Sequence, residues 1–196
     1  MRALYYETTI HKQIRKKREN RKERIQNDLH LYGGDVLLSE EMKKAYEQTH
    51  HKRSTVGEHT LRVALASVMT CYAFRKVKIN LNIPAVVVGS LCHDLGILGR
   101  DEKYSSAKIC SREHPHESVS VAKNLVNEIP DKSEEIIRRH MWPVGKSKAP
   151  NSIECIVVSL ADKYVAVKDL IKGSDSKKHN KECKKRIKKR IVKSFP

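Results

Sequence analysis

Apolar residues recur at helical spacing through most of the chain. Residues 54–77 repeat apolar positions every three or four residues, and Thr55 and Glu58 have the spacing of a capping box. The same period continues over residues 115–129, 131–143 and 151–173, and we expect these three helices to begin near Pro115, Asp131 and Asn151. No run shows the alternation of apolar and polar residues that is typical of strands, so the pattern predicts an all-α fold.

One segment is apolar almost throughout. Residues 83–96, "IPAVVVGSLCHDLG", have Pro84 where the first helical turn tolerates it and Gly96 where a helix can stop. These ends and the length of the run favour a buried helix over a buried strand. His93 and Asp94 then fall at its C-terminal end, in apolar surroundings where each costs free energy unless it has a partner.

The N-terminal region is helix-permissive but polar on nearly all sides. Residues 11–34 contain only a thin apolar seam, and we expect the Gly33-Gly34 pair to stop this helix. A short helix capped by Ser39 should follow. We therefore divide the chain into a basic N-terminal helical segment, a globular domain, and a basic C-terminal tail or helix, with the bounds 1–34, 35–173 and 174–196.

Positive charge is concentrated at the two ends. Residues 11–24 carry a net charge of +6 and residues 177–193 a net charge of +9, out of +17 for the whole chain. Basic segments of this kind can contact nucleic acid without sequence specificity, and they also attract polyanionic substrates. A solvated helix or tail is the simpler explanation for the C-terminal segment, because aromatic residues that could stack on bases are not interleaved with its charges.

The composition is not that of a membrane or secreted protein. No run approaches the roughly 18 to 20 apolar residues that a membrane span requires, and the N-terminus lacks the apolar stretch of a secretory signal. The five cysteines form no C-x-x-C pair, which is typical of free thiols in a reducing compartment. We therefore expect no membrane span and a cytoplasmic location.

Six residues able to bind metal fall on, or at the end of, these apolar elements. They are His59, His93, Asp94, His114 or its neighbour His116, His140 and Asp162. A single histidine on an apolar face is usually a hydrogen-bonded core residue, but five helices that each direct such a group inward are hard to explain separately. Imidazoles and carboxylates are ligands for transition metals. A carboxylate at a helix end, such as Asp94, can bridge two metals about 3.5 to 4 Å apart.

These residues resemble the H…HD…D pattern of the HD-domain metal-dependent phosphohydrolases. His59, His93-Asp94 and Asp162 carry the pattern, within "TVGEHTLRVA", "GSLCHDLGILGR" and "IVVSLADKY". The segments "HPHES" and "IIRRHMWP" are similar to motifs of the histidine-rich branch of that family. The resemblance extends over about residues 35–172 and implies an HD domain of five or more core helices around a metal site.

The resemblance also implies how the ligands are divided. One metal would be held by His59, His93, Asp94 and Asp162, and a second by His114 and His140 with Asp94 bridging. His114 is preferred to His116 because it stands four residues before the small residue Ser118, as in the H-P-x-x-small motif. A histidine-rich set favours two divalent transition metals over Mg, with Mn or Fe first and Co, Ni or Zn as alternatives.

The implied activity is metal-dependent hydrolysis of a phosphate ester, such as that of a nucleotide, by attack of a metal-bound hydroxide. Asp94 would act in catalysis, and Lys163 would either contact phosphate or lie on the surface. The alternative is an HD-fold module that binds a ligand or nucleic acid and has metals but little activity. Members that cleave cyclic dinucleotides carry a G-Y-P segment, whereas Met141-Trp142-Pro143 follows His140 here, which counts against that reaction.

Two further features stay open at this point. His50, His51 and Arg53 could line the mouth of the site, but we expect them to be solvated. Asp169 stands two helical turns after Asp162 and is either a supporting partner of the site or exposed.

Overall fold

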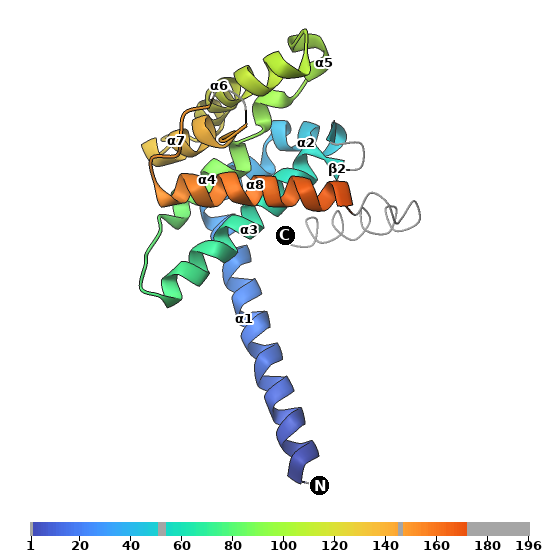
Figure 1. Cartoon of the computed structure of the whole chain (residues 1–196), viewed down its shortest axis with the longest axis vertical. Coiled ribbons are helices and arrows are strands. Elements are labelled where there is room, and N and C mark those ends of the chain that lie inside the picture. Colours follow the sequence, from blue (N-terminus) through green and yellow to red (C-terminus); the bar gives the residue numbers. More distant parts are fainter. Residues whose placement is uncertain (1, 51–53, 145–146, 172–196) are drawn as a thin grey trace.

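The computed structural model of the chain describes residues 2–50, 54–144 and 147–171. Helices dominate these residues, and the single hairpin among them has strands of only two residues each (Figure 1). In chain order the elements are α1 (Arg2–Leu38), α2 (Glu40–Glu47), β1 (Thr49–His50), β2 (Ser54–Thr55), α3 (Val56–Lys76), α4 (Ile83–Cys92), the 3-10 turn η1 (Leu95–Ile97), α5 (Arg100–Lys103), α6 (Ala107–Leu125), α7 (Asp131–Arg139) and α8 (Ile153–Ile171). The predicted all-α fold is confirmed.

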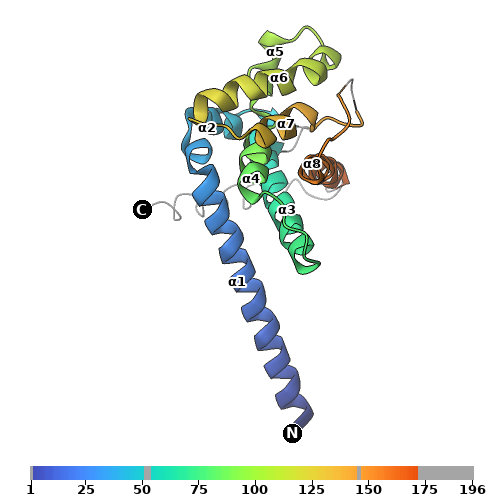
Figure 2. The ribbon, with the colours of Figure 1, turned by 90° about the vertical axis from the view of Figure 1, so that its left-hand side faces the viewer.

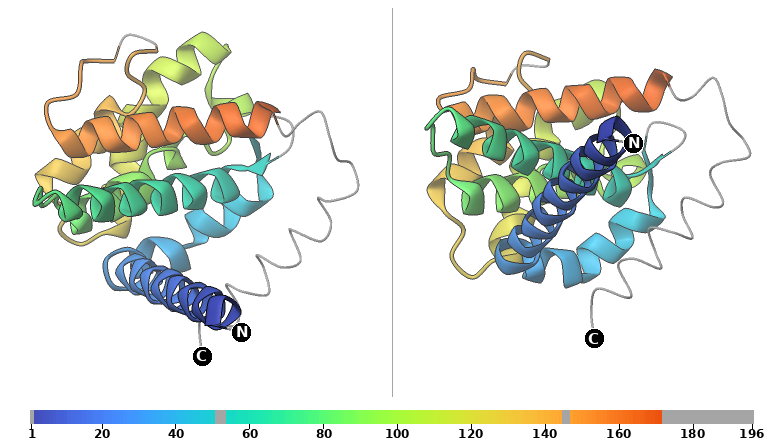
Figure 3. Two further views of the ribbon diagram at one scale, coloured as in Figure 1. Left: turned by 60° about the horizontal axis from the view of Figure 1, so that its bottom comes forward. Right: turned by 90° about the horizontal axis from the view of Figure 1, so that it is seen from below.

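Helix α4 is the centre of the fold. Every residue from Ala85 to Cys92 is buried, because α1, α3 and α7 all pack against this helix. Helix α8 packs on α3, so that α1 and α8 lie on opposite sides of the α3–α4 pair (Figures 2 and 3). The apolar run therefore forms a helix, as predicted, although the helix ends at Cys92 and Gly96 lies in the 3-10 turn that follows. The helix has no polar face because neighbours cover it on all sides.

Helix α1 extends well beyond the body of the fold. Its N-terminal half projects away from the other helices, and its side chains from Ile14 to Arg24 are exposed (Figures 1 and 2). Further along, Ile25, Leu29 and Val36 are buried in the core. The division of the chain at residues 34 and 173 stays a prediction, and the basic residues 177–193 lie outside the described residues. Among the helices described, none is long and apolar enough to cross a lipid bilayer.

The expectation that Gly33-Gly34 stops the first helix is wrong. Helix α1 runs through both glycines without interruption. A Cβ atom built on Gly33 would lie 2.3 Å from Leu91 Cδ1 and 3.0 Å from Val87 Cγ1, whereas one built on Gly34 has nothing within 4 Å. Gly33 is therefore a packing residue, since its missing side chain lets α1 approach α4 closely.

Local capping fixes several helix starts as predicted. The capping box of Thr55 and Glu58 is present in full at α3, and the Ser39 side chain accepts the N–H of Met42 at the start of α2. His59, one of the residues predicted to bind metal, lies in the first turn of α3.

The predicted start of α6 near Pro115 is wrong. The helix begins at Ala107, because the hydroxyl of Ser106 accepts the N–H of Ile109 and caps it there. Pro115 lies inside this helix. The sequence signal was misleading because proline is usually excluded from a helix interior.

Helix α8 begins at Ile153, two residues after the predicted start near Asn151, and Ser152 caps it. The Ser152 hydroxyl accepts the N–H of Cys155, while the Asn151 side chain donates to Glu135 instead. Helix α7 begins at Asp131 as expected, but Pro130 occupies its cap position and provides no side-chain bond.

The two adjacent glycines allow a matched test of the packing. Gly34→Ala should raise the free energy of unfolding by about 0.5–1 kcal/mol, because alanine favours helix over glycine and meets no neighbour. Gly33→Ala should lower it by about 1–3 kcal/mol, because Leu91 is fully buried and must move. Denaturant unfolding of both variants measures the difference, and stabilisation by both substitutions would contradict the close α1–α4 contact.

Candidate metal centre

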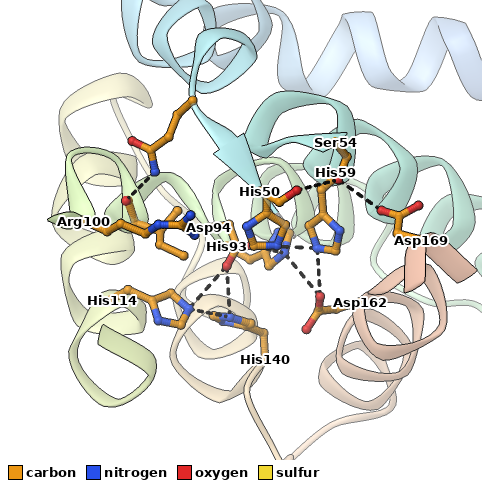
Figure 4. Close-up of polar contacts among 12 residues, drawn as sticks. His50, Ser54, His59, His93, Asp94, Arg100, His114, His140, Asp162 and Asp169 are labelled. Atoms are coloured by element: carbon orange, nitrogen blue, oxygen red, sulfur yellow. Dashed lines mark hydrogen bonds and ion pairs between the residues drawn. The ribbon is translucent and has the colours of Figure 1, made fainter. Parts of the chain in front are cut away.

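Five helices bring their polar residues to one buried point (Figure 4). His59 lies in the first turn of α3, His93 and Asp94 follow α4, His114 lies within α6, His140 ends α7, and Asp162 lies on α8. The four histidines are at most 3% exposed, and Asp94 is 5% exposed. All six predicted residues therefore meet, although His59 and Asp162 are 103 positions apart in the chain.

Three of the histidines share one orientation. In each ring Nδ1 bonds to a backbone carbonyl oxygen one turn earlier: His93 to Ser90 (2.8 Å), His114 to Cys110 (2.8 Å) and His140 to Ile137 (2.7 Å). A carbonyl oxygen only accepts, so Nδ1 must carry the proton in all three rings. In the neutral ring Nε2 then presents a lone pair, which is the form in which histidine binds metals.

These lone pairs point at one another on the α6–α7 side of the site. The Nε2 atoms of His114 and His140 are 3.0 Å apart. They also lie 3.3 and 3.5 Å from Asp94 Oδ1, which is itself an acceptor. Two neutral rings with protonated Nδ1 atoms have no hydrogen to share across this gap. A cation among the three acceptors resolves the conflict.

The second oxygen of Asp94 faces a different set of rings. Asp94 Oδ2 lies 3.4 Å from His93 Nε2 and 3.7 Å from His59 Nε2. His59 Nε2 is in turn 2.9 Å from Asp162 Oδ1, which lies 3.9 Å from His93 Nε2. Among the described residues, His93 Nε2 is buried and has no hydrogen-bond partner. The two oxygens of Asp94 are thus divided between two groups of imidazoles.

The electrostatics of the centre favour positive charge. Burial by itself raises the pKa of Asp94, but the surrounding imidazoles, His93 first among them, hold that pKa well below its usual range. The pKa of Asp162 is lowered as well, again against the effect of burial. Burial disfavours the charged form of His93, yet the two carboxylates raise the pKa of that ring to about 9. Both aspartates are therefore ionised, and a cation between them is stabilised.

These donors fit divalent transition metals. Two groups have all their ligand atoms within 4.8 Å of one another: His59, His93 and Asp162, and Asp94, His114 and His140. Each combines imidazole nitrogen with carboxylate oxygen, which is the mixed donor set that such metals prefer. The backbone bonds to Nδ1 would fix the rings of His93, His114 and His140 for coordination through Nε2. The individual ligand assignments remain a proposal.

The structure places His114 and His116 in different surroundings. His114 is buried at the site, whereas His116 is exposed and its Nδ1 lies 3.0 Å from Arg138 Nη1. This arrangement favours His114 as the ligand. It also explains the small residue of the "HPHES" segment, since the N–H of Gly96 donates to the hydroxyl of Ser118 (2.8 Å) and the two backbones nearly touch.

Lys163 is not a free surface lysine, because its amine already donates hydrogen bonds to two groups of the protein. Its Nζ donates to the carbonyl oxygen of His140 and to Asp162 Oδ2 (3.0 Å). The side chain is 27% exposed and lines the cavity above the centre. Lys163 therefore joins α8 to the end of α7 and keeps a positive charge beside the site.

Asp169 acts outside the centre, as a link between elements. It accepts two bonds from Arg62, of 2.5 and 2.8 Å, and its side chain is only 6% exposed. Ser54 Oγ lies 3.3 Å from its second oxygen. Asp169 thus ties α8 to α3 and to the hairpin, and of the two alternatives that the sequence left open, the exposed residue is excluded.

Sequence reasoning missed the position of His50. We expected a solvated residue, but His50 is 5% exposed and its Nε2 lies 4.0 Å from Asp94 Oδ2. The only sequence signal was its place shortly before the helix that bears His59. His51 and Arg53 lie outside the described residues.

A cavity of about 640 Å³ opens onto the centre. His50, Asp94, His114 and Asp162 form part of its lining. Arg100 and Lys163 supply positive charge, and Ile97, Met141 and Val144 supply apolar surface. A volume of this size is typical of small-molecule sites, which range over roughly 300–1,000 Å³.

Residues 56–167 match the HD domain family, and this match covers more than half of the 196-residue chain. The chain belongs to the HD domain family. The match includes all six predicted site residues and begins after His50. HD domains are generally metal-dependent hydrolases, and the His/Asp groups of this HD domain are compatible with that chemistry. Comparisons with curated proteins and with solved structures gave no match.

Metal binding should stabilise this HD domain, and Asp94 should carry much of the effect. An ion at 100 times its Kd adds about 2.7 kcal/mol to the free energy of unfolding. We expect Mn²⁺ to raise the melting temperature of the wild type, and Asp94→Asn to lose most of that rise because the two oxygens of Asp94 face both sets of imidazoles. Asp101→Asn is the control, since this residue lines the same cavity with a 97% exposed side chain. An equal Mn²⁺ effect in Asp94→Asn would contradict the shared role.

Proposed function

We propose that this HD domain is a metal-dependent phosphohydrolase that cleaves a phosphate ester, and that its substrate is a nucleotide. One observation carries the proposal: the two oxygens of Asp94 face separate groups of imidazoles at the floor of an open cavity. When bound there, two divalent metals would activate water and neutralise phosphate oxygens. That combination is the chemistry of phosphate ester hydrolysis.

The protein's own residues would position the ester. Asp94 is buried, and backbone bonds hold the rings of His93, His114 and His140 around it, so these residues need little rearrangement when substrate arrives. Lys163 is anchored at Asp162 and adds a positive charge next to the phosphate.

Arg100 is the second cationic residue of the cavity. Its Nη2 donates to the carbonyl oxygen of Thr49 (3.2 Å), which leaves further N–H groups of the guanidinium for a phosphate. Arginine binds phosphate through two parallel bonds, so Arg100 is suited to hold a phosphate that is not itself cleaved.

The residues that line the cavity support a nucleotide as substrate. Ile97, Met141 and Val144 provide an apolar wall for a base, while Arg100 and Lys163 provide charge for phosphate. The basic residues of α1 would attract such polyanions, and nonspecific contact with nucleic acid through the basic ends remains part of the proposal. A cytoplasmic location likewise stays a prediction.

The direct test is hydrolysis by the manganese-loaded protein. We expect release of phosphate or nitrophenol from a panel of nucleotides and aryl phosphate mono- and diesters, and loss of this activity to background in Asp94→Ala. Phosphate assays and chromatography of the nucleotides identify the substrate. A folded, metal-loaded protein that hydrolyses no member of the panel would contradict the proposal and favour a binding module.

Arg100→Ala should affect substrate binding more than chemistry. A charge-assisted bond contributes about 1.5–3 kcal/mol, so KM should rise by roughly 10-fold or more with a smaller change in kcat. Arg112→Ala is the matched control, because Arg112 pairs with Glu113 on the exposed side of α6. The role of Arg100 would be refuted if both variants kept the wild-type KM.

A further inference from the structure

His50 lies at the candidate metal centre although it is outside the residues that match the HD domain family. It ends strand β1. Its Nε2 lies 4.0 Å from Asp94 Oδ2, and its ring centroid is 4.7 Å from that of His59 (Figure 4). The ligand atoms of His50, His59 and Asp94 all lie within 4.8 Å of one another, as in the two groups described above.

The hairpin holds His50 in place through a chain of contacts. His50 pairs with Ser54 across the two strands. Ser54 Oγ lies 3.3 Å from the His50 carbonyl oxygen and 3.3 Å from Asp169 Oδ2. Asp169 is held in turn by both terminal nitrogens of Arg62. The backbone of His50 is thus fixed to α3 and α8, the helices that carry His59 and Asp162.

His50 also differs from His59 and His93 in its position relative to the cavity. His50 lines the cavity, whereas His59 and His93 do not. On the other side of Asp94, His114 lines the cavity together with Asp94 itself. Of the imidazoles around Asp94 Oδ2, His50 is therefore the one that meets the substrate space.

We propose that His50 is an additional ligand of the metal that His59, His93, Asp162 and Asp94 Oδ2 would hold. This inference rests on the proposal that the centre holds two metals. The group of His50, His59 and Asp94 shares two residues with that ligand set. Five side chains would then hold the first ion, whereas Asp94, His114 and His140 would hold the second and would leave it more positions for the substrate phosphate.

The test measures metal binding without substrate. His50→Phe keeps a ring beside His59 and removes both nitrogens, and His116→Phe changes an exposed histidine outside the cluster. In calorimetric titration with Mn²⁺, we expect His50→Phe to weaken one of two sites by on the order of 10–100-fold and to leave the other unchanged. His116→Phe should match the wild type. Two sites of wild-type affinity in His50→Phe would overturn the proposal and indicate a substrate contact instead.

A second measurement avoids any loss of folding in the variant. In the zinc-loaded wild type, ¹⁵N spectra of labelled histidines should show five Nε2 signals shifted by metal: His50, His59, His93, His114 and His140. Four shifted signals, with that of His50 unmoved, would overturn the proposal. Neither readout depends on hydrolysis. An inactive protein with five bound imidazoles would refute the proposed function alone, and an active one with four would refute this inference alone.

Discussion

At the centre of the fold, hydrogen-bond acceptors face one another without a hydrogen between them. His114 and His140 each use the Nδ1 proton on a carbonyl of their own helix, so in the neutral rings their Nε2 lone pairs converge on a carboxylate that also only accepts. The 3.0 Å approach of two such nitrogens has no hydrogen-bonded solution with neutral rings. Bound cations would satisfy all of these acceptors together. The surrounding structure holds the acceptors close to one another.

The rest of the molecule supplies that rigidity through contacts between distant segments. Helix α4 is enclosed on all sides and delivers Asp94 at its end, while Gly96 lets the next turn pack directly on the backbone of α6 beside His114. The capping box fixes the first turn of α3, and the Arg62–Asp169 pair sets α8 against α3. Each candidate ligand therefore lies on an element that another element holds in position.

The sequence predicted those features of the structure that depend on residues close together in the chain. Helical periodicity, the Thr55 cap and the apolar run before His93 are readable because each involves neighbours in the chain. The role of Gly33 was not readable, because a glycine that stops a helix and one that admits another helix look the same in sequence. His50 was missed because its position depends on contacts between distant parts of the chain. The hairpin, which Asp169 of α8 holds through Ser54, brings His50 to Asp94.

The most direct test of the central claim is the anomalous X-ray scattering of crystals grown with Mn²⁺. The account predicts two separate peaks, one beside Asp94 Oδ1 with His114 and His140, the other beside Asp94 Oδ2 with His59, His93 and Asp162. A centre without anomalous peaks, or with one peak that leaves either group of imidazoles unoccupied, would contradict it.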